Sequence, residues 1–189
     1  MPLARLPRYS LAQRAKRQVM RGGVIAYATE SCFGFGCHPK NAKALRCILR
    51  LKGRSSLKGM LVIGANMTQL QPYMMPLTQQ ALFYTKAYWP GHYTLLLPAP
   101  MLTLPWLRGF GHRTMGLRVT AHPETAALCC ALGTAIVSTS ANKTKQRSLK
   151  TAHACKKIFG KKILTLPGNI GKHRAPSTII DTISGQILR

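Results

Sequence analysis

The sequence predicts a single α/β domain, because short apolar strands alternate with capped helices along one uninterrupted chain. The 189 residues are enough for one hydrophobic core, and a hydrophobic fraction of 46% argues against disorder throughout. No repeat and no long linker divides the chain. We therefore expect an N-terminal tail over residues 1–9 and one domain over residues 10–189.

Helices are expected where a capping residue precedes a stretch of helix formers and a turn residue follows it. Ser10 is expected to cap a helix that runs to about Met20, and Pro123 is expected to open another as its first residue. Other helices are expected over residues 42–51, after Thr78 to residue 88, and after Thr151 to residue 159. Apolar runs predict strands over residues 24–27, 60–63, 93–97, 115–119, 135–137, 163–166, 178–180 and 187–188.

The charge is strongly one-sided. Lys and Arg number 28 against three acids, so the formal net charge is +25. Such a field attracts polyanions and speeds their encounter with the protein. Two explanations stay open: a composition that is basic throughout, which the scatter of the cations favours, or a selected tRNA-binding surface. The second is favoured by one cluster of cations, Lys143, Lys145, Arg147 and Lys150.

The scarcity of acids excludes several chemistries. Glu30, Glu124 and Asp181 lie too far apart in sequence to suggest a paired-carboxylate glycosidase or a carboxylate cage for a metal ion. The six cysteines form no C-x-x-C pair, and neither a P-loop nor a G-x-S-x-G motif is present. No apolar run is long enough for a membrane span and no export signal is evident, so we expect reduced cysteines and a cytoplasmic location without membrane contact.

Polar segments follow expected strands or helices at four points, which is where α/β proteins commonly form their sites. They are residues 29–31, residues 51–56, Arg118 within an apolar strand, and residues 138–142. Their hydroxyls, amide and three cations can together surround phosphate and carboxylate oxygens. Each has a simpler explanation: Lys52 and Arg54 as charges favoured at a helix C-terminus, and residues 138–142 as a capping turn. An unpaired Arg118 in an apolar strand is costly, which favours a function for it.

Six motifs follow one another over nearly the whole chain. They are ATESCFGFG at residues 28–36, the K-x-R of Lys52 and Arg54, WPG at residues 89–91 with Thr94, GLRV at residues 116–119 with His122-Pro123, STSAN at residues 138–142, and APSTIID at residues 175–181. In this order they resemble the motifs of the YrdC family. Each motif alone is weak, whereas six in the family order are specific. The length fits the single-domain form of the family.

The resemblance implies both a fold and a reaction. The expected fold is a twisted mixed sheet, parallel and antiparallel, flanked by helices around a basic concave cleft. The expected enzyme is a nucleotidyltransferase that converts L-threonine, bicarbonate and ATP into threonylcarbamoyl-AMP and pyrophosphate. A separate transfer complex would then modify adenosine 37 of ANN-decoding tRNAs. Mg²⁺ is expected to arrive with ATP, and no metal held by the protein is expected.

The resemblance also assigns roles to individual residues. The catalytic set around the phosphates and the carbamate is expected to be Lys52, Arg54, Ser140 and Asn142. Those expected to bind ATP are Lys52, Ser56, Thr114, Ser140, Ser148 and Arg189. Those expected to bind threonine are Thr29, Arg118, Ser138 and Ser177, with Arg118 on the threonine carboxylate.

The chain departs from the family pattern at a few positions. Ala28 stands for the usual Pro, Phe33 for the usual Tyr, His92 for a frequent Pro, and Lys143-Thr144 for the common Ser-Gly. None of these removes a charged member of the site. They therefore bear on substrate affinity rather than on the type of reaction.

Two other functions are considered. One is a basic factor for double-stranded RNA, tRNA or ribosome maturation that uses the same cleft; the other is a relative with an altered substrate. The joint K-x-R and S-x-N pattern favours the enzyme, because a protein that only binds RNA has no need of it. tRNA remains a partner hypothesis on the strength of the charge.

Overall fold

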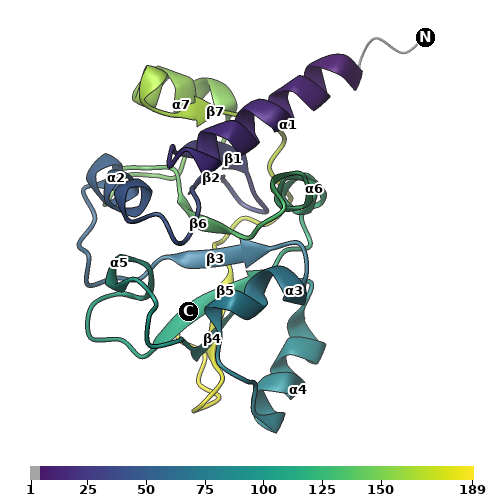
Figure 1. The fold of residues 1–189 in the computed structure, drawn as a ribbon, viewed down its shortest axis with the longest axis vertical. Helices are drawn as coiled ribbons and strands as arrows, with labels where there is room; N and C mark the ends of the chain where they lie inside the picture. The colour runs from purple at the N-terminus through teal and green to yellow at the C-terminus, as the bar shows by residue number, and fades with distance from the viewer. Residues whose placement is uncertain (1–4) are drawn as a thin grey trace.

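A mixed sheet of eight strands runs through the protein, and helices pack on both of its faces (Figure 1). The computed structural model describes residues 5–189 and, from residue 11 on, their side chains except that of Lys161. The strand order is β7-β1-β2-β6-β3-β5-β4-β8. Pairs β1–β7, β3–β5 and β4–β8 are parallel, and the other neighbours are antiparallel. The expected α/β class and the mixed sheet are confirmed.

The elements have the following bounds. The strands are β1 (Ile25–Ala28), β2 (Phe33–Gly36), β3 (Leu61–Gly64), β4 (Tyr93–Pro98), β5 (Thr114–Val119), β6 (Ile136–Ser140), β7 (Leu164–Thr165) and β8 (Thr178–Asp181). The helices are α1 (Arg5–Met20), α2 (Ala42–Lys52), α3 (Met67–Leu70), α4 (Gln79–Tyr88), α5 (Pro105–Arg108), α6 (Pro123–Leu132) and α7 (Ala152–Phe159), with short 3₁₀ turns at Gln71–Tyr73 and Gly160–Lys162.

Local capping explains where most helices begin and end. The hydroxyls of Thr78 and Thr151 accept bonds from backbone amides at the starts of α4 and α7, as predicted. Pro123 is the first residue of α6, also as predicted. Gly53 ends α2 in the left-handed conformation, at φ 57°, which a glycine adopts without strain.

The expected start of the first helix was wrong. Helix α1 begins at Arg5, so Ser10 lies inside it and does not cap it. Pro7 falls in the first turn of α1, where a proline is tolerated, so nothing in residues 5–9 forces the helix to begin at this cap. The expected tail over residues 1–9 therefore overlaps α1, while residues 1–4 lie outside the described residues.

One strand was missed from the sequence, and another was predicted that does not form. Strand β2 was not expected, because two of its four residues are glycines, which have low strand propensity; pairing with β1 and β6 on either side makes it a strand. The strand expected over residues 187–188 is instead an isolated antiparallel bridge between Ile180 and Ile187.

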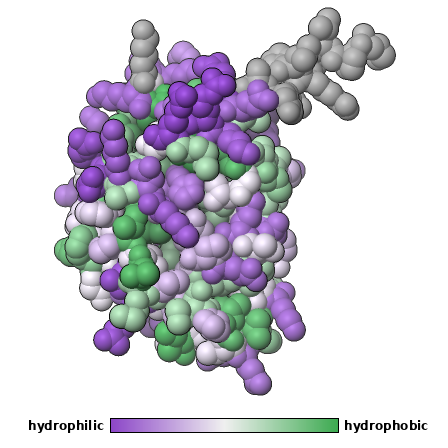
Figure 2. All heavy atoms as spheres, in the orientation of Figure 1, coloured by the Kyte–Doolittle hydropathy of each residue, from purple (hydrophilic) through white to green (hydrophobic). Residues whose placement is uncertain are grey.

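The core divides into two clusters, one on each face of the sheet. Alternation along β1 sends Ala26 and Ala28 to the larger cluster, and Ile25 and Tyr27 to the smaller one. The smaller cluster packs beneath α1 and α6, whose side chains Ala15, Val19, Cys129 and Leu132 complete it. Outside, hydrophilic side chains gather over the upper part of the face in Figure 2, around α1, and hydrophobic ones form small groups lower down.

The topology places the polar segments of the sequence side by side. The turn at residues 29–32 joins β1 to β2, β2 lies against β6 through the pair Gly34 and Ser140, and β6 lies against β3, which neighbours β5. The turn, the end of β6 and Arg118 of β5 therefore lie in the same region of the sheet. Within residues 5–189, no helix has the combined length and apolarity that crossing a membrane requires.

Candidate active site

A cavity of about 350 Å³ opens where these polar segments meet. It is lined by the turn at residues 29–32, the segment around Arg54, strands β5 and β6, the loop before β8 and the last residue of the chain. Nine of the site residues expected from the sequence line it: Thr29, Arg54, Thr114, Arg118, Ser138, Ser140, Ser148, Ser177 and Arg189. Segments far apart in the sequence thus contribute to one cavity.

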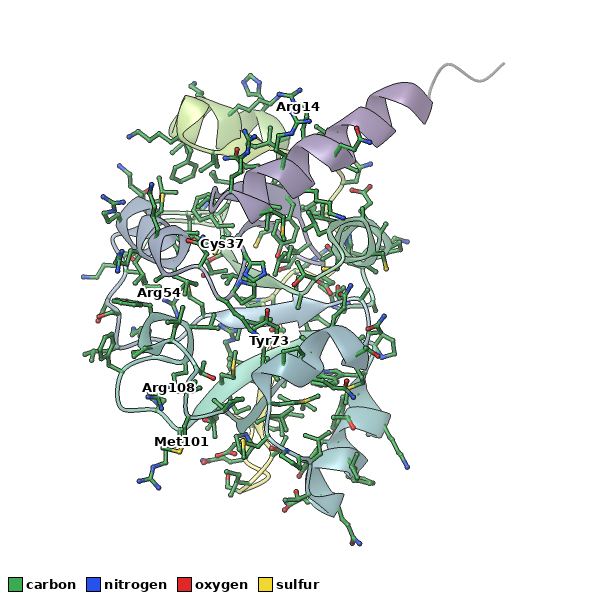
Figure 3. All side chains as sticks on the ribbon, in the orientation of Figure 1. Arg14, Cys37, Arg54, Tyr73, Met101 and Arg108 are labelled. Atoms are coloured by element: carbon green, nitrogen blue, oxygen red, sulfur yellow. The ribbon has the colours of Figure 1, made fainter. Side chains whose placement is uncertain are left out.

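The lining is rich in cations. Six Arg or Lys side chains contribute to it: Arg54, Arg108, Arg118, Lys150, Arg174 and Arg189. Figure 3 labels two of them, Arg54 and Arg108, on the side of the molecule where α2 and α5 lie. Of the three acids in the chain, Glu30 alone is among the lining residues. A cavity with this balance favours ligands that carry several negative charges.

Lys52 lies behind the cavity wall, as the last residue of α2, and is 3% exposed. Its Nζ donates to the backbone oxygens of Ser140 and Asn142, the latter at 3.1 Å, and to Oδ1 of Asn142 at 3.0 Å; the Ser140 Oγ lies 3.4 Å away. Burial, together with the charge of Arg54, lowers the pKa of Lys52 to about 8. Lys52 thus holds the Ser140–Asn142 turn while adding positive charge behind it.

Arg54 follows two residues later and reaches the cavity itself. Its guanidinium donates to the backbone oxygen of Gly59 at 2.7 Å, which fixes the side chain across the turn that follows α2. Burial and the charge of Arg189 lower the pKa of Arg54. Arg189 is held in turn by a bond from its Nε to the backbone oxygen of Ser177, at 3.2 Å. Both side chains therefore line the cavity, near enough for their charges to interact, and an anion bound between them would offset that repulsion.

Arg118 projects from β5 into the same cavity and is paired with Glu30. Its Nη2 donates to Oε2 of Glu30 at 3.0 Å, and both side chains are 5% exposed. Oε1 of Glu30 accepts from the hydroxyl of Thr120 at 2.6 Å. Burial by itself raises the pKa of Glu30, but Arg118 and Thr120 outweigh it, so the pKa lies below its ordinary value and the group is ionised at neutral pH.

The loop before β8 covers one side of the cavity. His173 of this loop stacks on His92, with ring centroids 3.9 Å apart, and His92 Nε2 lies 3.0 Å from the backbone oxygen of Ala175. The backbone amide of His173 donates to the oxygen of Glu30 at 3.2 Å, which ties the loop to the 29–32 turn. His92, which departs from the family pattern, therefore helps to hold this loop.

Three expected site residues do not line the cavity. Lys52 and Asn142 stand behind it and are bonded to each other, and Ser56 lies in the turn after α2. Glu30, Lys150, His92 and Arg174 also line it, although none of them was among the site residues expected from the sequence. Lys150 could have been found from its place in the basic cluster; it donates to the backbone oxygen of Ser31 at 2.6 Å. Phe33, where the family has Tyr, is fully buried in the larger core cluster.

The donor set suits anions better than a metal ion held by protein ligands. Among the described residues, no three His, Cys, Asp or Glu side chains are grouped to hold a metal. The Glu30 carboxylate is already paired with Arg118. The hydroxyls of Thr114, Ser140 and Ser148, together with the cations, can hydrogen-bond phosphate oxygens. A divalent ion here would therefore be held mainly by its own phosphate ligand.

The fold and the cavity define an α/β protein with a cavity whose lining carries six cations and one acid. The chain belongs to the Sua5/YciO/YrdC family, whose model, described as telomere recombination, matches residues 17–189. A relative from Chromobacterium violaceum, named threonylcarbamoyl-AMP synthase, is 54% identical over 188 residues, covering 100% of this chain and 97% of the relative. A relative of the same name from Thiobacillus denitrificans is 50% identical over 169 residues, covering 89% of each chain.

Solved structures share the fold. The crystal structure of P. abyssi Sua5 complexed with L-threonine has a TM-score of 0.83 and 26% sequence identity, covering 92% of this chain and 51% of that chain. This chain therefore spans about half the length of that Sua5 chain. E. coli YciO has a TM-score of 0.79 and 26% identity, covering 92% of this chain and 84% of that chain.

Proposed function

We propose that the protein is a threonylcarbamoyl-AMP synthase, a nucleotidyltransferase that converts L-threonine, bicarbonate and ATP into threonylcarbamoyl-AMP, pyrophosphate and water. The observation that carries the proposal is the meeting of the K-x-R segment with the S-x-N turn: Lys52 bonds both Ser140 and Asn142, and Arg54 and Ser140 line one cavity. Relatives of nearly the same length carry the corresponding name.

The arrangement fits the demands of this chemistry. Threonine and bicarbonate first combine to the carbamate with loss of water. An oxygen of that carbamate then attacks the α-phosphorus of ATP, a new P–O bond forms, and the bond to pyrophosphate breaks. Carbamate, carboxylate and triphosphate are all anions, so the reaction needs cations and hydrogen-bond donors that offset their repulsion. Arg54 and Arg189 in the lining, with the charge of Lys52, can supply this. The attack on phosphorus needs no protein base, because the carbamate is already an anion.

Other lining residues suit the amino acid. Arg118 is assigned to the threonine carboxylate, and Ser138, Ser177 and the turn at Thr29 also line the cavity. The Thr29 hydroxyl is already bonded to the backbone oxygen of Cys32 at 2.7 Å, which fixes this turn. Fixed positions for both reactants lower the entropic cost of bringing them together.

The product would serve the modification of adenosine 37 in ANN-decoding tRNAs, through a separate transfer complex. Mg²⁺ would enter bound to ATP, where it offsets phosphate charge, since the residues present suit a phosphate-held ion. A step in tRNA maturation of this kind belongs in the cytoplasm. Direct binding of tRNA to this chain is a further part of the hypothesis, motivated by the net charge of +25.

The test is release of pyrophosphate by the purified protein with ATP, Mg²⁺ and bicarbonate, with and without L-threonine. We expect release that requires threonine, and we expect Arg54→Ala to lower kcat/KM for ATP about a hundredfold. Lys86→Ala, which removes an exposed cation on α4, is the matched control and should retain full activity. Release that is independent of threonine would refute the substrate assignment.

A further inference from the structure

Glu30 is the one acid of this chain that lines the cavity, and it is 4% exposed. A carboxylate in a site meant for anions is unexpected, because it repels the ligands that the surrounding cations attract. Neither the sequence motifs nor the proposed chemistry gives it a task. Its contacts show instead that it is turned toward a partner within the protein.

The side chain and the backbone of Glu30 are both fixed. Thr120, which follows β5 directly, donates from its hydroxyl to Oε1 at 2.6 Å, and the same hydroxyl accepts from the amide of His122 at 3.2 Å. The backbone oxygen of Glu30 accepts from the amide of His173. Thr120 is 2% exposed, so these bonds face little competition from water. The carboxylate is therefore held in one place before any ligand binds.

The fixed Glu30 carboxylate accepts only one of the hydrogen bonds that the Arg118 guanidinium can donate. Its Oε2 receives one hydrogen bond, from Nη2, at 3.0 Å. Nη1 lies 3.5 Å from Nδ1 of His92, at the limit of a hydrogen bond. Within the described residues, Nε of Arg118 is buried and has no acceptor. A guanidinium has five donor hydrogens, so Arg118 keeps free donors while Glu30 fixes its orientation.

We propose that Glu30 is a positioning residue that orients the Arg118 guanidinium for the carboxylate of the amino-acid substrate. The inference rests on the proposed function, because it takes Arg118 to be the group that binds this carboxylate. An arginine with a free side chain would lose rotamer freedom on binding; one already held by Glu30 loses less, and its fork meets the ligand in a defined geometry. Glu30 also balances one positive charge among the six in the lining.

The test compares Glu30→Gln with the wild type and with Glu124→Gln as the matched control. Glu124 accepts from the amide of Asn169 and is not among the lining residues of the cavity. We expect Glu30→Gln to raise KM for threonine by about ten- to a hundredfold and to leave KM for ATP within about twofold. Glu124→Gln should match the wild type in both constants.

A second readout separates positioning from a merely structural role. L-Threoninamide lacks the carboxylate that Arg118 would bind. The wild type should therefore prefer threonine strongly over threoninamide in kcat/KM, and this ratio should fall about tenfold in Glu30→Gln. Equal losses for both amino-acid substrates, or equal rises of KM for threonine and ATP, would overturn the inference.

Thr120 provides the test if Glu30→Gln fails to fold. Thr120→Val removes the hydroxyl that fixes Oε1 and should raise KM for threonine in the same direction, by a smaller factor, while Thr120→Ser should restore it. Wild-type KM for threonine in Thr120→Val would then overturn the inference.

A wild type with no threonine-dependent pyrophosphate release refutes the proposed function and this inference together. An active wild type with unaltered Glu30→Gln refutes this inference alone.

Discussion

Lys52 is a buried cation whose charge depends on pH within the working range of most enzymes. Burial and Arg54 bring its pKa to about 8, and its amino group is held by acceptors from Ser140 and Asn142. Phosphate oxygens entering the cavity would stabilise the protonated form and raise that pKa again. The same residue thus fixes the turn and makes the charge of the site sensitive to pH.

The pH profile of kcat/KM for ATP should report this group. Lys52 loses its proton, and the site loses a positive charge, as the pH rises through about 8, so kcat/KM should fall about tenfold per pH unit above that value. The limb for kcat should lie at higher pH, because bound ATP favours the charged form. Steady-state pyrophosphate release from pH 6.5 to 9.5 measures both.

Lys52→Arg is the comparison for this profile. Its guanidinium stays charged over the whole range, so its kcat/KM should be lower overall but flat where the wild type falls. Deprotonation of threonine affects both proteins alike, so the difference between the two profiles reports Lys52. An identical alkaline limb in the variant would assign the titration to another group.

At the scale of elements, helix α2 positions Lys52, which is its last residue. Asn41 caps its start by accepting from the amide of Ala44 at 2.9 Å, and Gly53 ends it immediately after Lys52. Gly53 has φ 57° and ψ 41°, and a Cβ placed there would meet no atom within 4 Å. The cost of a side chain at this position is therefore conformational rather than steric.

The loss of stability on substituting Gly53 should depend on how readily the new residue adopts the left-handed backbone conformation. Gly53→Ala should lower the free energy of unfolding by about 1–2 kcal/mol, and Gly53→Asn by less, since Asn tolerates this conformation. Because the displaced residue would be Lys52, pyrophosphate release should decrease in the same order. Urea unfolding and the release assay measure the two effects. Equal stability of the two variants would contradict the assigned cap.

Whether an element could be predicted from the sequence depended on how far apart along the chain the interacting residues lie. The caps of α4 and α7 involve bonds from Thr78 and Thr151 to residues three positions away, so they were predictable. Strand β2 depends on pairing with β6, far along the chain, and was missed. The start of α1 was misjudged because Ser10 is a usable cap, whereas the helix begins earlier and holds Pro7 in its first turn, where proline is tolerated.

The contacts of the candidate site likewise divide into those that could be predicted from the sequence and those that could not. The resemblance in motif pattern linked Lys52 to Ser140 and Asn142, and the structure places them in contact. Nothing in the local sequence linked Glu30 to Arg118, which is 88 positions away. Which of the chain's few acids faces the cavity follows from the sheet order, and the sheet order is not encoded in local patterns.

For the whole molecule, the charge of +25 has two opposing consequences. Like charges repel one another in the folded chain, which lowers its stability, and salt screens that repulsion. The same field raises the local concentration of ATP, a multiply charged anion, and salt weakens that attraction too. Threonine carries no net charge at neutral pH, so the long-range field acts on it far less.

Raising NaCl from 50 to 500 mM should therefore move three quantities in different ways. The midpoint of thermal unfolding should rise by about 5 °C or more, KM for ATP should rise several-fold, and KM for threonine should change by less than about twofold. Calorimetry and pyrophosphate release at each salt concentration measure them. Sucrose, an uncharged stabiliser, is the control, since it should raise the midpoint without raising KM for ATP. If both Michaelis constants rose equally with salt, the effect would come from loosening of the site and not from the field of the protein.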